Sequence, residues 1–344
     1  GTGIQASEDM TSIVSDIIVN TDTETGSKMI EELNNSSTDK ENDLSLQVIS
    51  AISEKDTTKL NTLSENNKEQ IDKLTETAIK NADASEQSAQ LIAKVVANVS
   101  DELANKVVQE VTKNSTEENQ ALSAKVMKSI VETNPEKIEN LSDENKGNII
   151  SQTIEAAKNQ ADGNSSDSLD LSNTIAEIVT KSDDETSAKV LETLSKATED
   201  SESKLALSVV SNLTKQENFE EKLDMLSVTS SAVDQTINKL VEKAVENASS
   251  NDDLKLVTNI VENTKGSVAD KIINSANKSA ESKKKITEII VKVVENNPEK
   301  AIEIIEKNKN TNTVLETVKT KIENNEAVSI DDFSEVFDSD VSPN

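Results

Sequence analysis

The chain has 344 residues and a formal net charge of −29, and it contains no Arg, His, Cys, Trp or Tyr. Without His and Cys it lacks the commonest general base, the thiol nucleophile and the usual zinc ligands, so the composition disfavours an enzyme and a cofactor site. The negative charge argues against nucleic acid, and the lack of any run of about 18 apolar residues argues against membrane insertion.

Apolar residues recur at intervals of three and four from Ile13 to Phe337, and Gly and Pro are scarce. This pattern predicts helices throughout the chain. Four segments align without a gap when their lysines are superimposed, and the spacings between these lysines are 78, 83 and 82 residues. The four anchors are Lys28, Lys106, Lys189 and Lys271. The sequence is therefore an array of repeats.

Two kinds of position support the alignment. Eleven positions before the anchors stand Ile17, Val95, Ile178 and Ile260. Two positions before them the residue is always small, namely Gly26, Ala104, Ser187 and Ala269. A small residue at a fixed place in each repeat favours the close approach of a neighbouring helix.

The repeats predict four units of about 80 residues at 1–86, 87–166, 167–250 and 251–330, followed by a C-terminal capping or docking helix and tail at 331–344. Short amphipathic helices are marginal alone and must bury their apolar stripes against neighbours. We therefore expect an all-α fold, an elongated right-handed α-solenoid-like stack of short helical hairpins.

An Asn-Pro-Glu-Lys turn occurs twice in register, at 134–137 and 297–300. Proline suits the first position of a helix, because its φ is already helical and it has no N–H to satisfy. The turn therefore predicts the end of one helix and the start of the next. In the other two units the same restart is expected without proline.

Several local interactions are expected at helix starts. Three segments are typical of helix starts, in which a Ser precedes acidic residues: 100–102, 142–144 and 182–185. Three of the anchor lysines follow a Glu by four residues, which favours ion pairs within one helix. These pairs are Glu24 with Lys28, Glu102 with Lys106, and Glu185 with Lys189.

Two loops carry closely spaced oxygen ligands. Residues 20–26 resemble a calcium loop, but Gly26 stands one place too late and the aligned segments are helix starts, so we expect a capped helix. Residues 162–167 have no Glu at the distance that a bidentate ligand requires, and are interpreted as a flexible insertion. No metal site is predicted, although the acidic surface is compatible with weak, non-specific binding of divalent cations.

The C-terminal segment carries Ile330, Phe333, Val336 and Phe337 on one helical face. This face is too large for a free tail. It either caps the last hairpin of its own chain or docks on the first hairpin of another copy, around Ile13, Ile17 and Ile18. The second alternative is a head-to-tail contact that does not close, and such contacts generate filaments.

The favoured function is a non-enzymatic structural or scaffold protein whose partners are other copies of itself or another protein. The alternative is a monomeric acidic platform that binds a peptide or a basic protein. An enzyme that uses carboxylates only is least favoured, because three Phe cannot build an aromatic sugar pocket. The excess of Lys, Asn and Ile suggests a prokaryote or phage with an AT-rich genome. The compartment stays open, with an extracellular or cell-surface location preferred to the cytoplasm.

Overall fold

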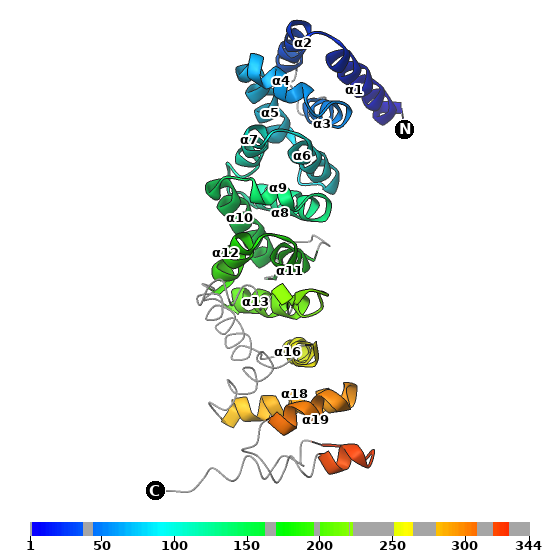
Figure 1. Cartoon of the computed structure of the whole chain (residues 1–344), viewed down its shortest axis with the longest axis vertical. Helices are drawn as coiled ribbons and strands as arrows, with labels where there is room; N and C mark the ends of the chain where they lie inside the picture. Colours follow the sequence, from blue (N-terminus) through cyan, green and yellow to red (C-terminus); the bar gives the residue numbers. More distant parts are fainter. Residues whose placement is uncertain are drawn as a thin grey trace. The chain divides into compact units, whose positions relative to one another are not determined.

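The structure is a computed structural model that describes residues 2–36, 44–161, 170–195, 200–219, 221–222, 251–263, 280–307 and 319–329. Helices are the only regular elements in these ranges, which confirms the prediction of an all-α fold (Figure 1). The chain divides into two compact units, Gly1–Val190 and Leu191–Asn344, and each is described by itself.

The first unit begins with α1 (Thr2–Asn20), α2 (Thr23–Ser36), α3 (Ser45–Lys55), α4 (Lys59–Asn66) and α5 (Lys68–Asn81). It continues with α6 (Glu86–Asn98), α7 (Asp101–Val111), α8 (Glu117–Thr133), α9 (Glu136–Glu139) and α10 (Asp143–Ala161). Helix α11 (Leu171–Lys181) follows, and α12 (Asp184–Ser195) begins in this unit.

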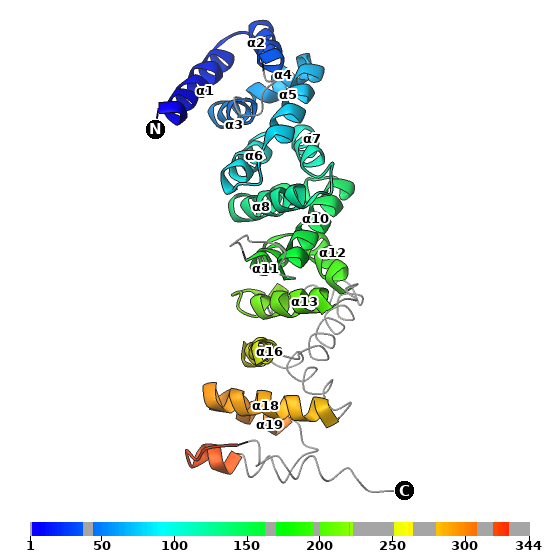
Figure 2. The same cartoon turned by 180° about the vertical axis from the view of Figure 1, so that it is seen from behind.

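These helices form two layers (Figures 1 and 2). In the layer that starts with α1, each helix packs on the next in the order α1, α3, α6, α8 and α11, and in the layer that starts with α2 the order is α2, α5, α7 and α10. Apart from the short helices α4 and α9, consecutive helices alternate between the two layers, so the first unit is a stack of helical hairpins. The prediction of stacked hairpins is confirmed for this unit.

The core lies between the two layers and between successive hairpins. Its largest fully buried side chains include Ile18, Ile30, Ile52, Leu63, Leu74, Ile92, Met127, Ile130 and Ile149. The small residues of the repeat are also buried here, at Gly26, Ala104 and Ser187. A Cβ atom on Gly26 would lie 3.3 Å from Leu63 Cδ2, so the small residue allows α4 to approach α2 closely.

The Asn-Pro-Glu-Lys turn restarts a helix, as predicted. Helix α8 ends at Thr133, Pro135 has a helical φ of −59°, and α9 begins at Glu136. Lys137 Nζ then donates to the Val99 carbonyl oxygen at 3.0 Å. The equivalent lysine of the proline-free turn, Lys59, donates to the Thr21 carbonyl oxygen at 2.6 Å. Each lysine thus ties the restart to the end of the preceding hairpin's first helix.

Helices begin at all three predicted starts, namely α7 at Asp101, α10 at Asp143 and α12 at Asp184. Ser100 Oγ accepts from Leu103 N at 3.4 Å, and Ser142 Oγ accepts from Asn145 N at 3.3 Å. Ser182 is not the cap of α12, because it ends α11 as its C-cap residue. Asp183 caps α12 instead, and its Oδ1 accepts from Thr186 N at 2.6 Å.

The predicted ion pairs hold only in part. Lys28 and Glu24 are paired at 2.7 Å, as expected. The pairing of Lys106 with Glu102 is wrong. Lys106 pairs with Glu110 at 2.8 Å, and Glu102 pairs with Lys68 of α5. Glu102 lies on the exposed first turn of α7, within reach of Lys68 from the neighbouring helix α5.

The second unit contains α13 (Asp200–Leu213), α16 (Asn251–Asn263), α18 (Ala280–Asn296) and α19 (Pro298–Lys307) among its described residues. Helix α13 packs on α16, α16 on α18, and α18 on α19. Buried Val209, Val257, Ile260, Ile289 and Val293 fill these contacts. Lys271 and Ala269 lie outside the described residues, so the division of the whole chain into four units stays a prediction.

Candidate interaction surfaces

The outer face of α1 carries exposed apolar side chains. Met10, Ile13 and Ile17 are 54%, 56% and 41% exposed, and they are the large hydrophobic residues that the described part of the chain leaves exposed. Their spacing of three and four places them on one side of the helix. Ile18 lies on another side and is fully buried, so it belongs to the core and not to this surface. Met10 was missed by the sequence prediction, although it shares the same spacing.

The repeat shows that the exposure of Ile17 is unusual. Its equivalents Val95, Ile178 and Ile260 are only 2%, 1% and 2% exposed. Each of these three residues lies on a helix that packs on the preceding helix of its layer: α6 packs on α3, α11 on α8, and α16 on α13. Among the described residues, α1 has its layer neighbour α3 on one side only. The outer face of α1 therefore corresponds to the surface that packs on a preceding helix in the other repeats, and in α1 this surface is exposed.

The predicted docking residues of the C-terminal segment, Ile330, Phe333, Val336 and Phe337, lie outside the described residues. The structure therefore does not test whether this segment meets Ile13 and Ile17. Of the sequence-predicted pair of surfaces, only the acceptor side on α1 is described.

A polar groove lies in the other layer of the first unit. It has a volume of about 290 Å³ and is lined from α4, α5, α7 and α10. Its charged side chains are Lys68, Asp72, Glu102, Lys106 and Glu144. The amides of Asn105, Gln109 and Asn145 also line it. The Lys68–Glu102 ion pair joins α5 to α7 at this groove. With ammonium, carboxylate and amide groups together, the groove suits a polar chain of mixed charge.

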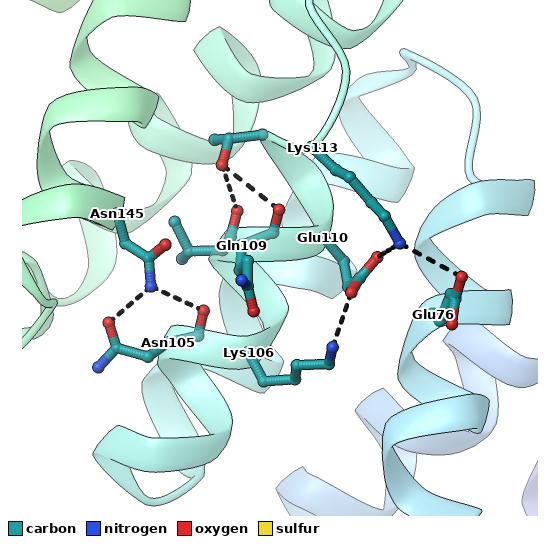
Figure 3. Close-up of polar contacts among 9 residues, drawn as sticks. Glu76, Asn105, Lys106, Gln109, Glu110, Lys113 and Asn145 are labelled. Atoms are coloured by element: carbon teal, nitrogen blue, oxygen red, sulfur yellow. Dashed lines mark hydrogen bonds and ion pairs between the residues drawn. The ribbon is translucent and has the colours of Figure 1, made fainter.

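Glu110 lies beside this groove with a side chain that is only 6% exposed (Figure 3). Its two oxygens accept from Lys106 Nζ at 2.8 Å and Lys113 Nζ at 3.0 Å, and Lys113 also reaches Glu76 at 3.3 Å. Burial raises the pKa of Glu110, but the hydrogen bonds and charges of Lys106 and Lys113 outweigh it and hold the pKa below its ordinary value. The two lysines stabilise the charged form of Glu110, and Lys113 connects this carboxylate to Glu76 of α5.

This network was not predicted from the sequence. A signal was present, because Glu110 stands between the apolar residues Val108 and Val111 and has lysines four residues before and three residues after it. Both lysines can reach one carboxylate on a helix surface.

Buried amides connect successive hairpins. Asn145 Nδ2 donates to Asn105 Oδ1 at 2.8 Å and to the Asn105 carbonyl oxygen at 3.0 Å, as Figure 3 shows. Gln152 Nε2 donates to the carbonyl oxygens of Thr112 and Asn114 at 2.8 and 2.9 Å. Gln152 thus satisfies backbone acceptors that follow the C-terminal end of α7, where no helical partner exists. The role of the two amides is to fix the register of the stack.

Residues 20–26 form a capped helix, as predicted. Helix α1 ends at Asn20, and Asp22 accepts from Thr25 N at 2.9 Å and from Thr25 Oγ1 at 3.0 Å. These hydrogen bonds lower the pKa of Asp22. The other loop, residues 162–167, lies outside the described residues. Within the described ranges no cluster of three or more acidic side chains is placed to hold a metal ion. None of the helices described combines the length and apolarity needed to cross a bilayer.

Comparison with known proteins gives no family. No model of a known protein family matches the sequence, and no curated protein matches it. Among solved structures, the chain is similar to an engineered protein at 13% identity and a TM-score of 0.30, covering 91% of this chain and 97% of that one. It is also similar to a chain described as a computational design of self-assembling cyclic homo-oligomers. That match has 18% identity and a TM-score of 0.14, and it covers 93% and 99% of the two chains. Neither similarity assigns a function to this chain.

Proposed function

We propose that this protein is a non-enzymatic helical-repeat scaffold that associates with other copies of itself head to tail. The observation that carries the proposal is the exposed apolar face of α1, formed by Met10, Ile13 and Ile17. Removing such side chains from water contributes roughly 25 cal/mol per Å² of apolar area, and apolar faces of this kind mark interaction sites.

The sequence predicts the complementary surface in the C-terminal segment, with Ile330, Phe333, Val336 and Phe337. A surface near one end of the chain that fits a different surface near the other end makes a heterologous contact. If the rotation between copies does not close a ring, repetition of this contact builds a filament or a surface layer. The negative charge of −29 on each copy limits association at low ionic strength.

Light scattering coupled to size-exclusion chromatography tests the proposal. We expect the average mass of the intact chain to rise with protein concentration and with salt, because salt screens the repulsion between copies. A chain that stays monomeric at the highest concentrations and at high salt would overturn the proposal. Deletion of residues 327–344 tests the predicted donor, because a truncated chain that associates as strongly as the intact chain would exclude that segment from the contact.

The polar groove supports a second candidate function. Its mixture of Lys68, Lys106, Asp72, Glu102 and Glu144 fits an extended peptide with both charged and amide groups. In that case the protein would be a monomeric platform for a peptide or a basic protein. Calorimetry with an extended peptide that carries lysine, glutamate and asparagine side chains separates the two functions. Binding to a chain that is monomeric at every concentration supports the platform, and no binding argues against it.

A further inference from the structure

We infer that α18 of a second copy packs on the outer face of α1, in the way that α3 packs on α6 within one chain. The inference rests on the self-association proposed above and names the two helices that meet. The C-terminal segment can add to this contact, but the contact does not depend on it.

The acceptor side follows from the repeat. Helix α1 corresponds to α6, α11 and α16, each of which packs on a preceding helix of its layer. Ile17 is 41% exposed, whereas its three equivalents are at most 2% exposed. The surface that fits this position is therefore a helix of the same type as α3, α8 or α13.

Helix α18 is such a helix, because Ile289 aligns with Val48 of α3, Val126 of α8 and Val209 of α13. One residue later, Ile290 is half-buried, whereas its equivalents Ile49, Met127 and Val210 are buried. Val294, four residues after Ile290, is also half-buried. Its equivalents in the other repeats are buried, namely Ser53, Val131 and Thr214. Helix α18 thus offers apolar side chains at positions that its counterparts bury, which complements the open face of α1.

Ion pairing does not drive the proposed contact between α18 and α1. One ion pair of the α3–α6 contact has no counterpart in the proposed contact between α18 and α1. Lys94 of α6 pairs with Glu54 of α3 at 2.8 Å, but Asp16 and Glu295 stand at those two positions in α1 and α18. The contact is therefore driven by apolar burial, and salt strengthens it by screening the repulsion between copies.

Two substitutions test the contact from opposite sides. Ile17→Asp removes the acceptor and leaves α18 intact, and Val294→Asp removes the donor and leaves α1 intact. Each variant alone should associate at least roughly tenfold more weakly than the unchanged chain, since charge in the centre of an apolar contact is costly. Because the contact is heterologous, an equimolar mixture of the two variants should form a one-to-one dimer that cannot grow. Analytical ultracentrifugation measures both effects.

Ser12→Asp is the matched control, because Ser12 is exposed on α1 away from the apolar face and receives the same charge. Ile290→Asp is a second donor variant if Val294→Asp loses helical structure in circular dichroism. Folded variants that associate as strongly as the unchanged chain, or that do not pair when mixed, would overturn the inference. If deletion of residues 327–344 abolishes association while the α18 variants do not affect it, self-association stands and the assignment to α18 falls. If the intact chain never associates, both fall.

Discussion

Replacement of Glu110 by Gln tests the account of the ion-pair network in Figure 3. The substitution keeps the shape of the side chain and one acceptor oxygen, but it removes the charge that holds Lys106 and Lys113. A hydrogen bond to a charged group contributes about 1.5–3 kcal/mol. Here the loss is smaller, because the Lys106 and Lys113 side chains are 29% and 52% exposed and water can solvate them. We expect the free energy of unfolding to fall by about 1 kcal/mol at neutral pH.

The loss of unfolding free energy caused by Glu110→Gln should depend on pH. The pKa of Glu110 is lowered in the folded protein, so its contribution is present above the unfolded-state pKa of about 4.3 and is lost as pH falls through the folded-state pKa. The difference between Glu110→Gln and the unchanged chain should therefore shrink as the solution is acidified below about pH 4.

Far-UV circular dichroism during urea denaturation is the suitable assay, because the chain has no Trp or Tyr to report by fluorescence. Glu102→Gln is the control, since Glu102 forms an exposed ion pair with Lys68 and its loss should not change the midpoint measurably. A Glu110→Gln variant as stable as the unchanged chain at neutral pH, or one whose deficit persists when the carboxylate is protonated, would refute the reasoning.

Two further predictions concern neighbouring or equivalent positions. Ile18→Ala should destabilise the first unit by about 2–4 kcal/mol because Ile18 is fully buried, whereas Ile17→Ala should change the stability of the monomer by less than about 0.5 kcal/mol. Equal losses in thermal unfolding would contradict the assignment of Ile17 to the surface. Lys137→Met and Lys59→Met should each cost about 0.5–1.5 kcal/mol in urea denaturation, because each removes a bond to the end of the preceding hairpin's first helix. Lys128→Met is the control, since Lys128 pairs only at 3.5 Å with the partly exposed Glu132.

The sequence alone was sufficient for features that depend on local chemistry. The helix restart at Pro135, the cap at Ser100 and the ion pair between Glu24 and Lys28 all arise within a few residues of chain. The all-α character has the same origin, because apolar spacing and scarce Gly and Pro act along each segment.

The sequence did not predict which residues of different helices interact. Lys106 could reach either Glu102 or Glu110 on its own helix, and in the structure it pairs with Glu110 while Glu102 pairs with Lys68 of α5. Within the predicted helix start at 182–185, Asp183 caps α12, because Ser182 is the last residue associated with α11. Each outcome depends on where a neighbouring element lies, which no local pattern specifies.

The face of α1 shows the same division. Apolar spacing placed Ile13, Ile17 and Ile18 together as candidates, and the repeat showed that Ile17 occupies a contact position. Only the tertiary structure separated them, burying Ile18 against its own hairpin and leaving Ile13 and Ile17 in contact with water. The physical reason is that a helix has an apolar stripe wide enough for two neighbours, and burial depends on which of those neighbours is present.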